Sequence, residues 1–331
     1  MPHKMPLDEV LIVIALASYV IGALSLLVYF FSREDWLRNL GATLAVAGCI
    51  VQFAQLIARY ETTHIWPLLN LYGSLSLFAA MGVAIFSVFA FRYKLWFAGA
   101  LVLAIAAIAL AYGVTWDEGT MPAVPSLQSY WAKIHVPLVV SAYGAFLVSF
   151  VFSILYLVKY YAELAVAGGK VASQMGTDVV GAALRVTPTY MIARIALEDA
   201  GVPVDTVAAE PGEAIVAGSP MSSWLATLPS LGQIDVLTYR AVAVGLPLLT
   251  LGIITGAMWA HESWGAYWQW DPKETAALFS WIVYAIYMHL HTRAAWKGLR
   301  TSWICVAGFA SIVFCYLGVN IWISGLHSYK M

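Results

Sequence analysis

The sequence predicts an all-α protein with about eight membrane-spanning helices. Of its 331 residues, 62% are hydrophobic and only 11% are charged, and the mean hydropathy is +0.80. A soluble globular protein carries about 25% charged residues. We therefore expect lipid rather than water to be the main solvent of the chain.

Eight apolar runs are long enough, or nearly so, for a helix that crosses a bilayer, which needs about 20 residues. They lie near residues 10–31, 38–58, 67–91, 95–113, 136–160, 238–260, 275–293 and 301–323. Asp8 and Glu9 precede the first run, and no small-residue cleavage site follows it. We expect this run to be a retained helix and not a signal peptide.

The distribution of Lys and Arg predicts the orientation of the helices, because cytoplasmic loops carry an excess of these residues. If the N-terminus is outside, the inner side holds twelve of them: Arg33, Arg38, Arg92, Lys94, Lys159, Lys170, Arg185, Arg194, Arg240, Arg293, Lys297 and Arg300. The outer side holds five: Lys4, Arg59, Lys133, Lys273 and Lys330. Both termini are then expected on the outer side.

A change in composition divides the chain into three parts. Residues 1–161 carry the first five helices, and residues 238–331 carry helices six to eight. Between them, residues 162–237 are rich in Ala, Gly, Val, Pro and acidic side chains. We interpret this part as an inner-side insert of mixed or flexible structure. A small regulatory or assembly module is the alternative.

Several classes of function are disfavoured by composition and motifs. The balance of 17 basic against 18 acidic residues is unlike the basic footprint of a nucleic-acid-binding protein. The sequence has no Gly-rich Walker loop for a nucleotide phosphate. The cysteines Cys49, Cys305 and Cys315 lie in apolar runs without metal-ligand or redox spacing, so we interpret them as small buried hydrophobes.

The most informative segment is the Trp-rich loop or short helix expected between helices six and seven, at about residues 259–274. Five large aromatic rings fall within residues 259–270 and include Trp264, Tyr267, Trp268 and Trp270. One interpretation is an interfacial aromatic belt. The other is a platform on which a flat apolar ring system such as a porphyrin stacks.

The end of this segment has a helix-start pattern. Asp271 is counted with the platform residues, but it can also serve as the N-cap of a helix. Pro272 would then be the first helical residue, and Glu274 would be the partner that completes a capping box. Lys273 can either meet a haem propionate or remain solvated.

The segment resembles a known family signature. WGAYWQWDPKE at 264–274 is similar to the tryptophan-rich WWD motif of the haem-handling proteins CcsA (also called ResC), CcmC and CcmF. The flanking residues resemble the CcsA branch of this family. The similarity is dense from about Leu228 to Tyr329. That branch often has Asn where this chain has His261, so the resemblance implies no role for His261.

The histidines supply candidate ligands, since neutral imidazole is a usual axial ligand of haem iron. His135 and His327 match the positions where the resemblance implies two external haem ligands. His289, in an apolar run, matches the ligand of a second, membrane-embedded haem whose opposing ligand comes from the partner CcsB (ResB). His64 and His261 are secondary candidates.

The resemblance implies haem handling and cytochrome c maturation. We expect the chain to bind haem b as substrate and to present it at the outer face of a bacterial inner membrane, in preference to a thylakoid membrane. It would then promote thioether attachment to Cys-x-x-Cys-His of apocytochrome c, as a cytochrome c haem lyase acting with CcsB. The expected partners are therefore CcsB, apocytochrome c, haem and the bilayer, with no nucleic acid.

Three alternatives stay open. They are a haem transporter without ligation chemistry, a b-type cytochrome subunit for electron transfer, and an assembly scaffold that never touches haem. No expected spanning helix carries two histidines several turns apart, as b-type bundles often do.

Overall fold

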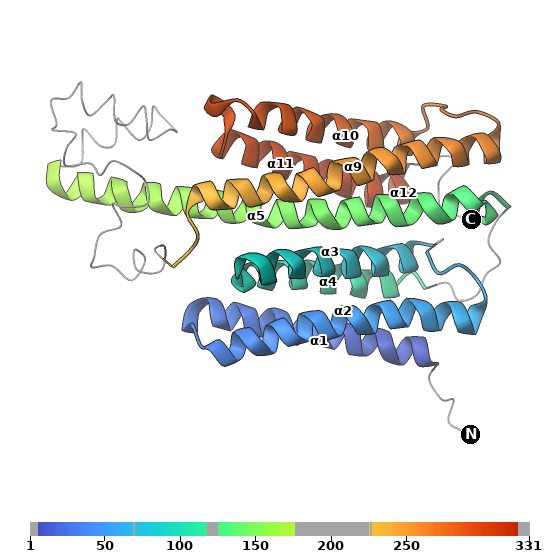
Figure 1. Ribbon diagram of the computed structural model, residues 1–331, viewed down its shortest axis with the longest axis horizontal. Coiled ribbons are helices and arrows are strands. Elements are labelled where there is room, and N and C mark those ends of the chain that lie inside the picture. Colours follow the sequence, from blue (N-terminus) through green and yellow to red (C-terminus); the bar gives the residue numbers. More distant parts are fainter. Residues whose placement is uncertain (1–5, 69, 118–124, 176–224, 226, 324–331) are drawn as a thin grey trace. The chain divides into compact units, whose positions relative to one another are not determined.

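The computed structural model describes residues 6–68, 70–117, 125–175, 225 and 227–323. Every regular element in these residues is helical (Figure 1). The α-helices are α1 (Leu7–Ser32), α2 (Asp35–Thr63), α3 (Leu71–Tyr93), α4 (Gly99–Val114), α5 (Tyr130–Met175), α9 (Leu231–Trp264), α10 (Pro272–His291), α11 (Leu299–Val313) and α12 (Val319–Trp322). Short helices are η1 (Trp96–Ala98), η2 (Pro125–Gln128), η4 (Ala294–Trp296) and the π-helical turn η5 (Phe314–Gly318). The all-α fold predicted from the sequence is confirmed.

Each of the eight predicted apolar runs corresponds to one helix or to consecutive helical elements. In the described part of the chain, seven helical segments are long and apolar enough to cross a membrane. The run at 275–293 corresponds to α10, which has 20 residues but is less apolar, because it contains Lys273, Glu274, His289 and His291. The exact number of spanning helices and the positions of the termini stay predictions.

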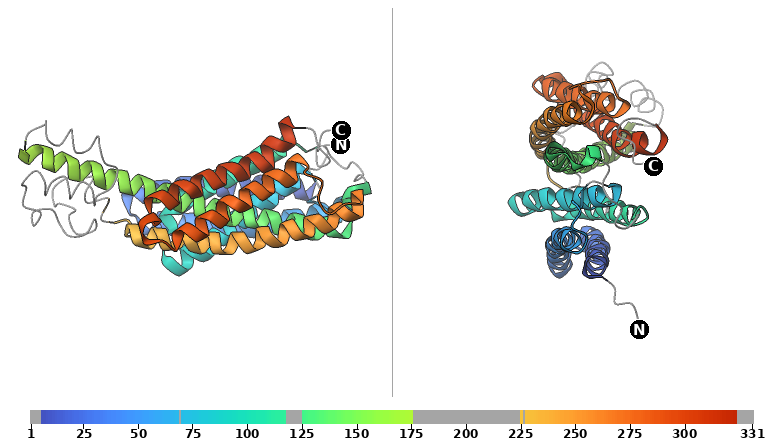
Figure 2. Two further views of the ribbon diagram at one scale, coloured as in Figure 1. Left: turned by 90° about the horizontal axis from the view of Figure 1, so that it is seen from above. Right: turned by 90° about the vertical axis from the view of Figure 1, so that its right-hand side faces the viewer.

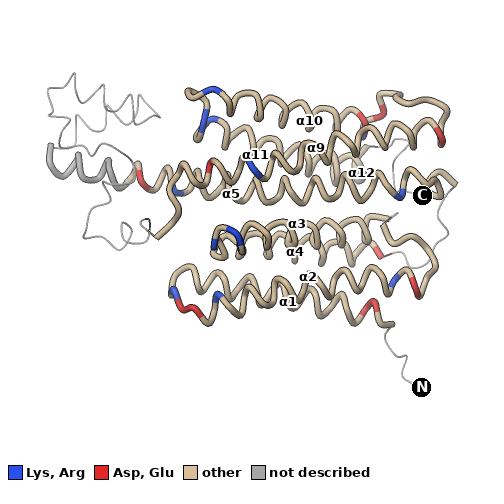
Figure 3. The backbone as a smooth tube through the Cα atoms, viewed as in Figure 1, with Lys and Arg blue, Asp and Glu red and all other residues tan. Residues whose placement is uncertain are grey.

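The chain forms two compact units, Met1–Ser153 with Leu237–Met331, and Ile154–Val236. In the first unit the helices run side by side along a common direction (Figures 1 and 2). Helix α1 packs on α2 and α4, α3 packs on α2 and α4, and α10 packs on α11. The Lys, Arg, Asp and Glu side chains of this unit gather mostly near helix ends (Figure 3). This distribution is that of helices whose middle turns lie in lipid.

Close packing in the first unit depends on small residues. A Cβ at Gly41 of α2 would lie 2.5 Å from Cγ of Leu26 on α1. Small residues let helix backbones approach closely in membranes, where packing replaces the hydrophobic driving force. Large apolar side chains such as Phe31, Ile50 and Ile108 are exposed on the outside of these helices, as expected for surfaces in contact with lipid.

Buried polar side chains in α1, α2 and α3 hydrogen-bond to one another. Tyr19 donates to Gln52, Gln52 donates to Ser76, Ser76 donates to Gln55, and Gln55 donates to the Tyr72 hydroxyl at 2.9 Å. Because unpaired polar groups are costly in lipid, these pairs fix how the three helices pack.

A cation and two carboxylates lie at the adjacent ends of α1, α2 and α4. The buried Arg59 forms ion pairs with Asp8 (3.2 Å) and Asp117, and its guanidinium lies 4.3 Å from the Tyr72 ring centre. The charge of Arg59 is therefore balanced by two carboxylates at this end of the helices.

Helix α5 is much longer than the run predicted at 136–160, because it begins at Tyr130 and continues to Met175. The alanines that follow the predicted boundary at 161 are good helix formers, so the first part of the predicted insert extends the helix. In the second unit, Lys159 donates to the carbonyls of Leu225 (3.2 Å) and Leu228 (3.3 Å) and pairs with Glu163 (3.3 Å). Residues 176–224 of the insert lie outside the described residues, and the predicted division into three parts stays a prediction.

Candidate haem-binding site

The Trp-rich segment forms the connection between α9 and α10. Helix α9 ends at Trp264, and Gly265 follows with a φ of +79°, where its N–H donates to the His261 carbonyl at 2.9 Å. A glycine in the left-handed conformation is a common end to a helix. Trp270 also has a positive φ, +57°, which costs an L-residue about 1–2 kcal/mol. The loop thus turns sharply at both of its ends.

The predicted helix start at Asp271 is confirmed. The Asp271 carboxylate accepts from the Lys273 N–H at 2.9 Å, and Glu274 accepts from the backbone N–H groups of Asp271 (3.3 Å) and Gln269 (2.9 Å). Asp271 is buried. Its carboxylate therefore caps α10 and fixes where the loop ends and the helix begins. This contact is structural.

His135 lies on α5 because this helix begins at Tyr130, whereas the apolar run predicted near 136–160 begins just after His135. Its Nδ1 lies 2.7 Å from the carbonyl oxygen of Gly252 on α9. Because a carbonyl only accepts, Nδ1 carries the proton and the lone pair is on Nε2. Metal-binding histidines are usually oriented by such a bond to a backbone carbonyl. This hydrogen bond therefore fixes the orientation of the His135 ring relative to α9.

Neighbouring residues on α9 fix the position of the His135 ring. A Cβ at Gly256 would lie 2.8 Å from ring atoms of His135, so only glycine leaves room for the imidazole there. The Trp259 ring lies 5.6 Å from the His135 ring at an angle of 36°. Trp259 is buried, and its indole N–H donates to the Ser126 carbonyl at 2.7 Å. The imidazole of His135 is thus confined by the backbone of α9 and by the Trp259 indole, whose position is fixed by its hydrogen bond to Ser126.

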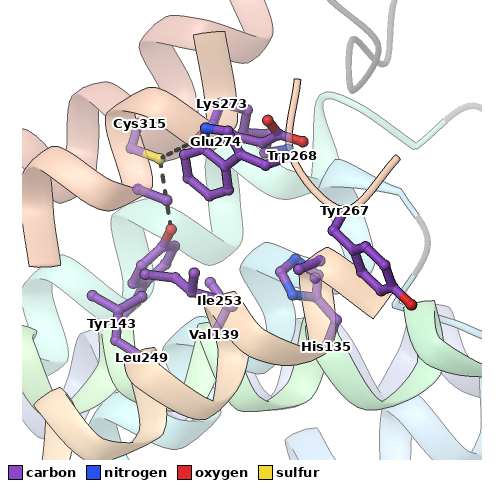
Figure 4. Close-up of a pocket in the computed structure, with 13 residues that line it drawn as sticks. His135, Val139, Tyr143, Leu249, Ile253, Tyr267, Trp268, Lys273, Glu274 and Cys315 are labelled. Atoms are coloured by element: carbon purple, nitrogen blue, oxygen red, sulfur yellow. Dashed lines mark hydrogen bonds between the residues drawn. The ribbon is translucent and has the colours of Figure 1, made fainter. Parts of the chain in front are cut away.

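One pocket brings His135 together with the Trp-rich loop (Figure 4). The enclosed space amounts to about 70 Å³, less than the roughly 300–1,000 Å³ of sites that enclose a drug-sized ligand, so a flat ring system would extend beyond it through the open side. Its lining residues come from α5, α9, the loop, α10 and η5, and they are His135, Val139, Tyr143, Leu249, Ile253, Gly256, Ala257, Tyr267, Trp268, Lys273, Glu274, Ala277 and Cys315. This combination of a histidine, aromatic rings and aliphatic walls fits a flat apolar ligand that carries a metal.

The predicted platform residues do not all line this pocket. Tyr267 and Trp268 line it. Trp264 packs on Trp259, with ring centres 5.4 Å apart, and Trp270 is 68% exposed and meets Trp268 edge to face at 5.6 Å. Trp270 is therefore a neighbour of a lining ring, whereas Trp264 contacts the indole that lies beside His135.

The secondary candidates fall in different places. Lys273 lines the pocket. His261 is exposed and stacks on Tyr267, with ring centres 4.2 Å apart. His64 is exposed and follows the last residue of α2, with a left-handed backbone conformation. Neither histidine lines the pocket, but His261 contacts Tyr267, which does.

The two remaining predicted ligands are not seen in the pocket. His327 lies outside the described residues, so its pairing with His135 stays a prediction. His289 is in the last turn of α10, exposed, and borders a separate open hollow with Arg293 and Trp296. His291, two residues further along α10, is buried and stacks on Tyr239 with ring centres 4.6 Å apart.

Sequence reasoning did not single out Tyr143 and Cys315 as pocket residues. The Tyr143 hydroxyl lies 3.8 Å from the Cys315 sulfur, which in turn lies 3.8 Å from the Lys273 carbonyl oxygen. Cys315 is buried as predicted, but it faces the pocket from the π-helical turn η5. Such π-helical turns often occur at functional sites, and nothing in the apolar run around residue 315 indicates one.

Comparison with known proteins assigns the family. The profile of the family described as "Cytochrome C assembly protein" matches residues 68–327. The chain belongs to this family. Similar curated proteins are named cytochrome c biogenesis protein CcsA. The protein from Picosynechococcus sp. is 34% identical, over 94% of this chain and 95% of its own length. The protein from Synechococcus sp. (strain JA-3-3Ab) is 35% identical, over 90% and 88%. The resemblance to the CcsA branch is thus confirmed.

A solved structure shares the fold. The protein titled "Cytochrome c Heme Lyase CcmF" superposes with a TM-score of 0.56 at 16% identity. The match covers 96% of this chain and 48% of that protein. At this identity the likeness concerns the fold alone.

Proposed function

We propose that this membrane protein binds haem in the pocket beside His135 and promotes its covalent attachment to apocytochrome c. The observation that carries the proposal is the pairing of an oriented imidazole with the Trp-rich loop in one pocket. The Nδ1 hydrogen bond to Gly252 turns Nε2 into the ligand atom, and Tyr267 and Trp268 supply ring faces beside it. Membership of a cytochrome c assembly family agrees with haem as the substrate.

The chain's contribution to the reaction is mainly positional. Each thiol of the Cys-x-x-Cys-His motif adds across a haem vinyl group, so that sulfur bonds to one vinyl carbon and the proton goes to the other. The addition is redox-neutral and needs no side-chain nucleophile from this protein. Holding thiol and vinyl in near-attack geometry can supply about 7–11 kcal/mol of the barrier.

His327 and His135 are proposed as the two axial ligands at the outer side of the membrane. Two imidazoles fill both axial positions and keep the iron from binding oxygen. The histidine of the apocytochrome motif then displaces one of them as the thiols react. The site is proposed to face the periplasm of a bacterial inner membrane, as the Lys and Arg distribution predicts.

A second haem site at His289, shared with a CcsB partner, is supported by the outer surface of α10. Phe279, Ile282 and Ile286 are exposed, and His289 continues this stripe at helical spacing. An ionisable side chain that faces lipid is costly and usually has a function. A partner helix that covers the stripe and supplies the opposing ligand would remove this cost.

Co-expression with an apocytochrome in a host that lacks its own maturation genes tests the proposal. His135→Ala should reduce covalent haem staining of the cytochrome at least tenfold, with and without a CcsB protein. His64→Ala is the matched control, because His64 is an exposed histidine away from the pocket, and it should leave staining unchanged. Equal staining in both variants would reject the function. If haem binds but is never attached, the chain is a transporter or delivery protein.

A further inference from the structure

The last turn of α9 carries an exposed histidine, His261, on a backbone that is fixed by hydrogen bonds. The His261 carbonyl accepts the N–H of Gly265 at 2.9 Å, at the point where the helix ends. The next side chain, that of Glu262, accepts a hydrogen bond from the Ser129 hydroxyl at 2.9 Å. The imidazole of His261 is therefore attached to a helix end that is itself held in place.

Tyr267 belongs to the loop that follows this helix, and it lines the pocket. It lies beside His135 (Figure 4) and is 53% exposed, so it is at the open side of the pocket. The enclosed space of about 70 Å³ is smaller than a porphyrin, so a haem bound at His135 would extend through this opening. Tyr267 is thus a ring that the extending porphyrin would meet.

The rings of His261 and Tyr267 are stacked. Their centres lie 4.2 Å apart, and their planes are inclined by 17°. Ring pairs attract one another beyond the effect of the area that they bury. A binding residue is best positioned when packing against a rigid element fixes its rotamer. His261 provides such packing, because it covers one face of the Tyr267 ring from the end of α9.

We propose that His261 is a positioning residue, which holds Tyr267 at the open side of the pocket so that its ring flanks the haem bound at His135. This inference rests on the proposed function and adds a residue that acts on haem through another side chain. His261 does not bind the iron. Without its imidazole, Tyr267 turns toward solvent, and haem loses a wall contact while its iron ligands stay the same.

The experiment titrates haem into the purified full-length protein in detergent and follows binding by absorption. His261→Gln removes the ring and should weaken haem binding by about three- to tenfold, the range that an aromatic pair accounts for, without shifting the absorption bands. His261→Phe restores a flat ring and should bind haem within about twofold of the parent protein. His64→Gln is the matched control, because it removes an exposed imidazole away from the pocket, and it should leave haem affinity unchanged.

A Tyr267→Ala background tests whether His261 acts through Tyr267. In that background His261→Gln should change haem affinity by less than about twofold, since the effects of residues in contact are not additive. The proposal is overturned if His261→Gln has its full effect in this background, or if it has no effect in the parent protein. Absorption bands that shift in both His261→Gln and His261→Phe would overturn it as well, because His261 would then bind the iron.

A fluorine label separates failure of this inference from failure of the proposed function. Fluorotyrosine incorporated at position 267 reports the stack by NMR in the absence of haem, because a neighbouring ring shifts its resonance. His261→Gln should move this resonance toward that of fluorotyrosine in water, and His261→Phe should move it less. A resonance that His261→Gln leaves in place overturns the stack. If the stack is present but the parent protein binds no haem, the proposed function itself fails, and the positioning role fails with it.

Discussion

The first four helices and the pocket differ in whether their buried polar groups have hydrogen-bond or ion-pair partners. In α1 to α4 the polar side chains satisfy one another, from Tyr19 to Tyr72, and Arg59 is paired with two carboxylates. In the pocket, the Trp268 indole N–H is buried with no described acceptor, and Trp270 is exposed in a left-handed conformation. Polar side chains thus pair with one another within α1 to α4, whereas the pocket contains a buried donor with no acceptor among the described residues.

This difference predicts that damage to the two regions will have different consequences. Changes in α1 to α4 should lower the stability of the protein and leave the haem affinity of the folded fraction unchanged. Changes around the pocket should lower haem affinity with little effect on stability.

The largest expected effect is that of Arg59→Leu. It leaves Asp8 buried without its cation, and breaking a buried ion pair in this way costs about 3–5 kcal/mol. We expect a large loss of folded protein, measured as yield and thermal stability in detergent.

Arg38→Leu is the control for this variant, since its ion pair with Asp35 at 2.9 Å is solvent-exposed and such pairs are worth about 0–1 kcal/mol. Equal stability of the two variants would contradict a structural role for Arg59. A loss of haem affinity in folded Arg59→Leu protein would contradict the separation between the regions.

A smaller effect is expected for Gly256→Ala. The added methyl group would lie 2.8 Å from the His135 ring, so the imidazole must move from its hydrogen bond with Gly252. Haem affinity should fall by about tenfold, the change expected for a displaced ligand orientation, while thermal stability stays close to that of the parent. Gly232→Ala is the control, because a Cβ there meets nothing within 4 Å. An unchanged haem affinity in Gly256→Ala would show that the ring position is not critical.

The sequence predicted the helical fold and the capping box at Asp271 because both follow from local patterns. A run of apolar residues long enough for a bilayer must be helical, and Asp-Pro-Lys-Glu matches a known helix start.

What the sequence could not predict is which helix face turns toward the pocket. In lipid, apolar residues occupy both the buried and the exposed faces of a helix, so periodicity no longer separates them. For this reason the sequence did not indicate that Tyr143 and Cys315 line a pocket, although it correctly predicted that Cys315 is buried. The length of α5 was missed because its continuation is less apolar, although its alanines favour helix.

The central claim is that Nε2 of His135 binds the iron of haem, and the most direct measurement is chemical rescue. His135→Gly removes the imidazole and leaves space for free imidazole to enter. The claim predicts that the purified variant loses the absorption bands of imidazole-ligated haem and regains them when imidazole is added. Matched spectra of the parent and His135→Gly proteins without added imidazole would show that another residue binds the iron.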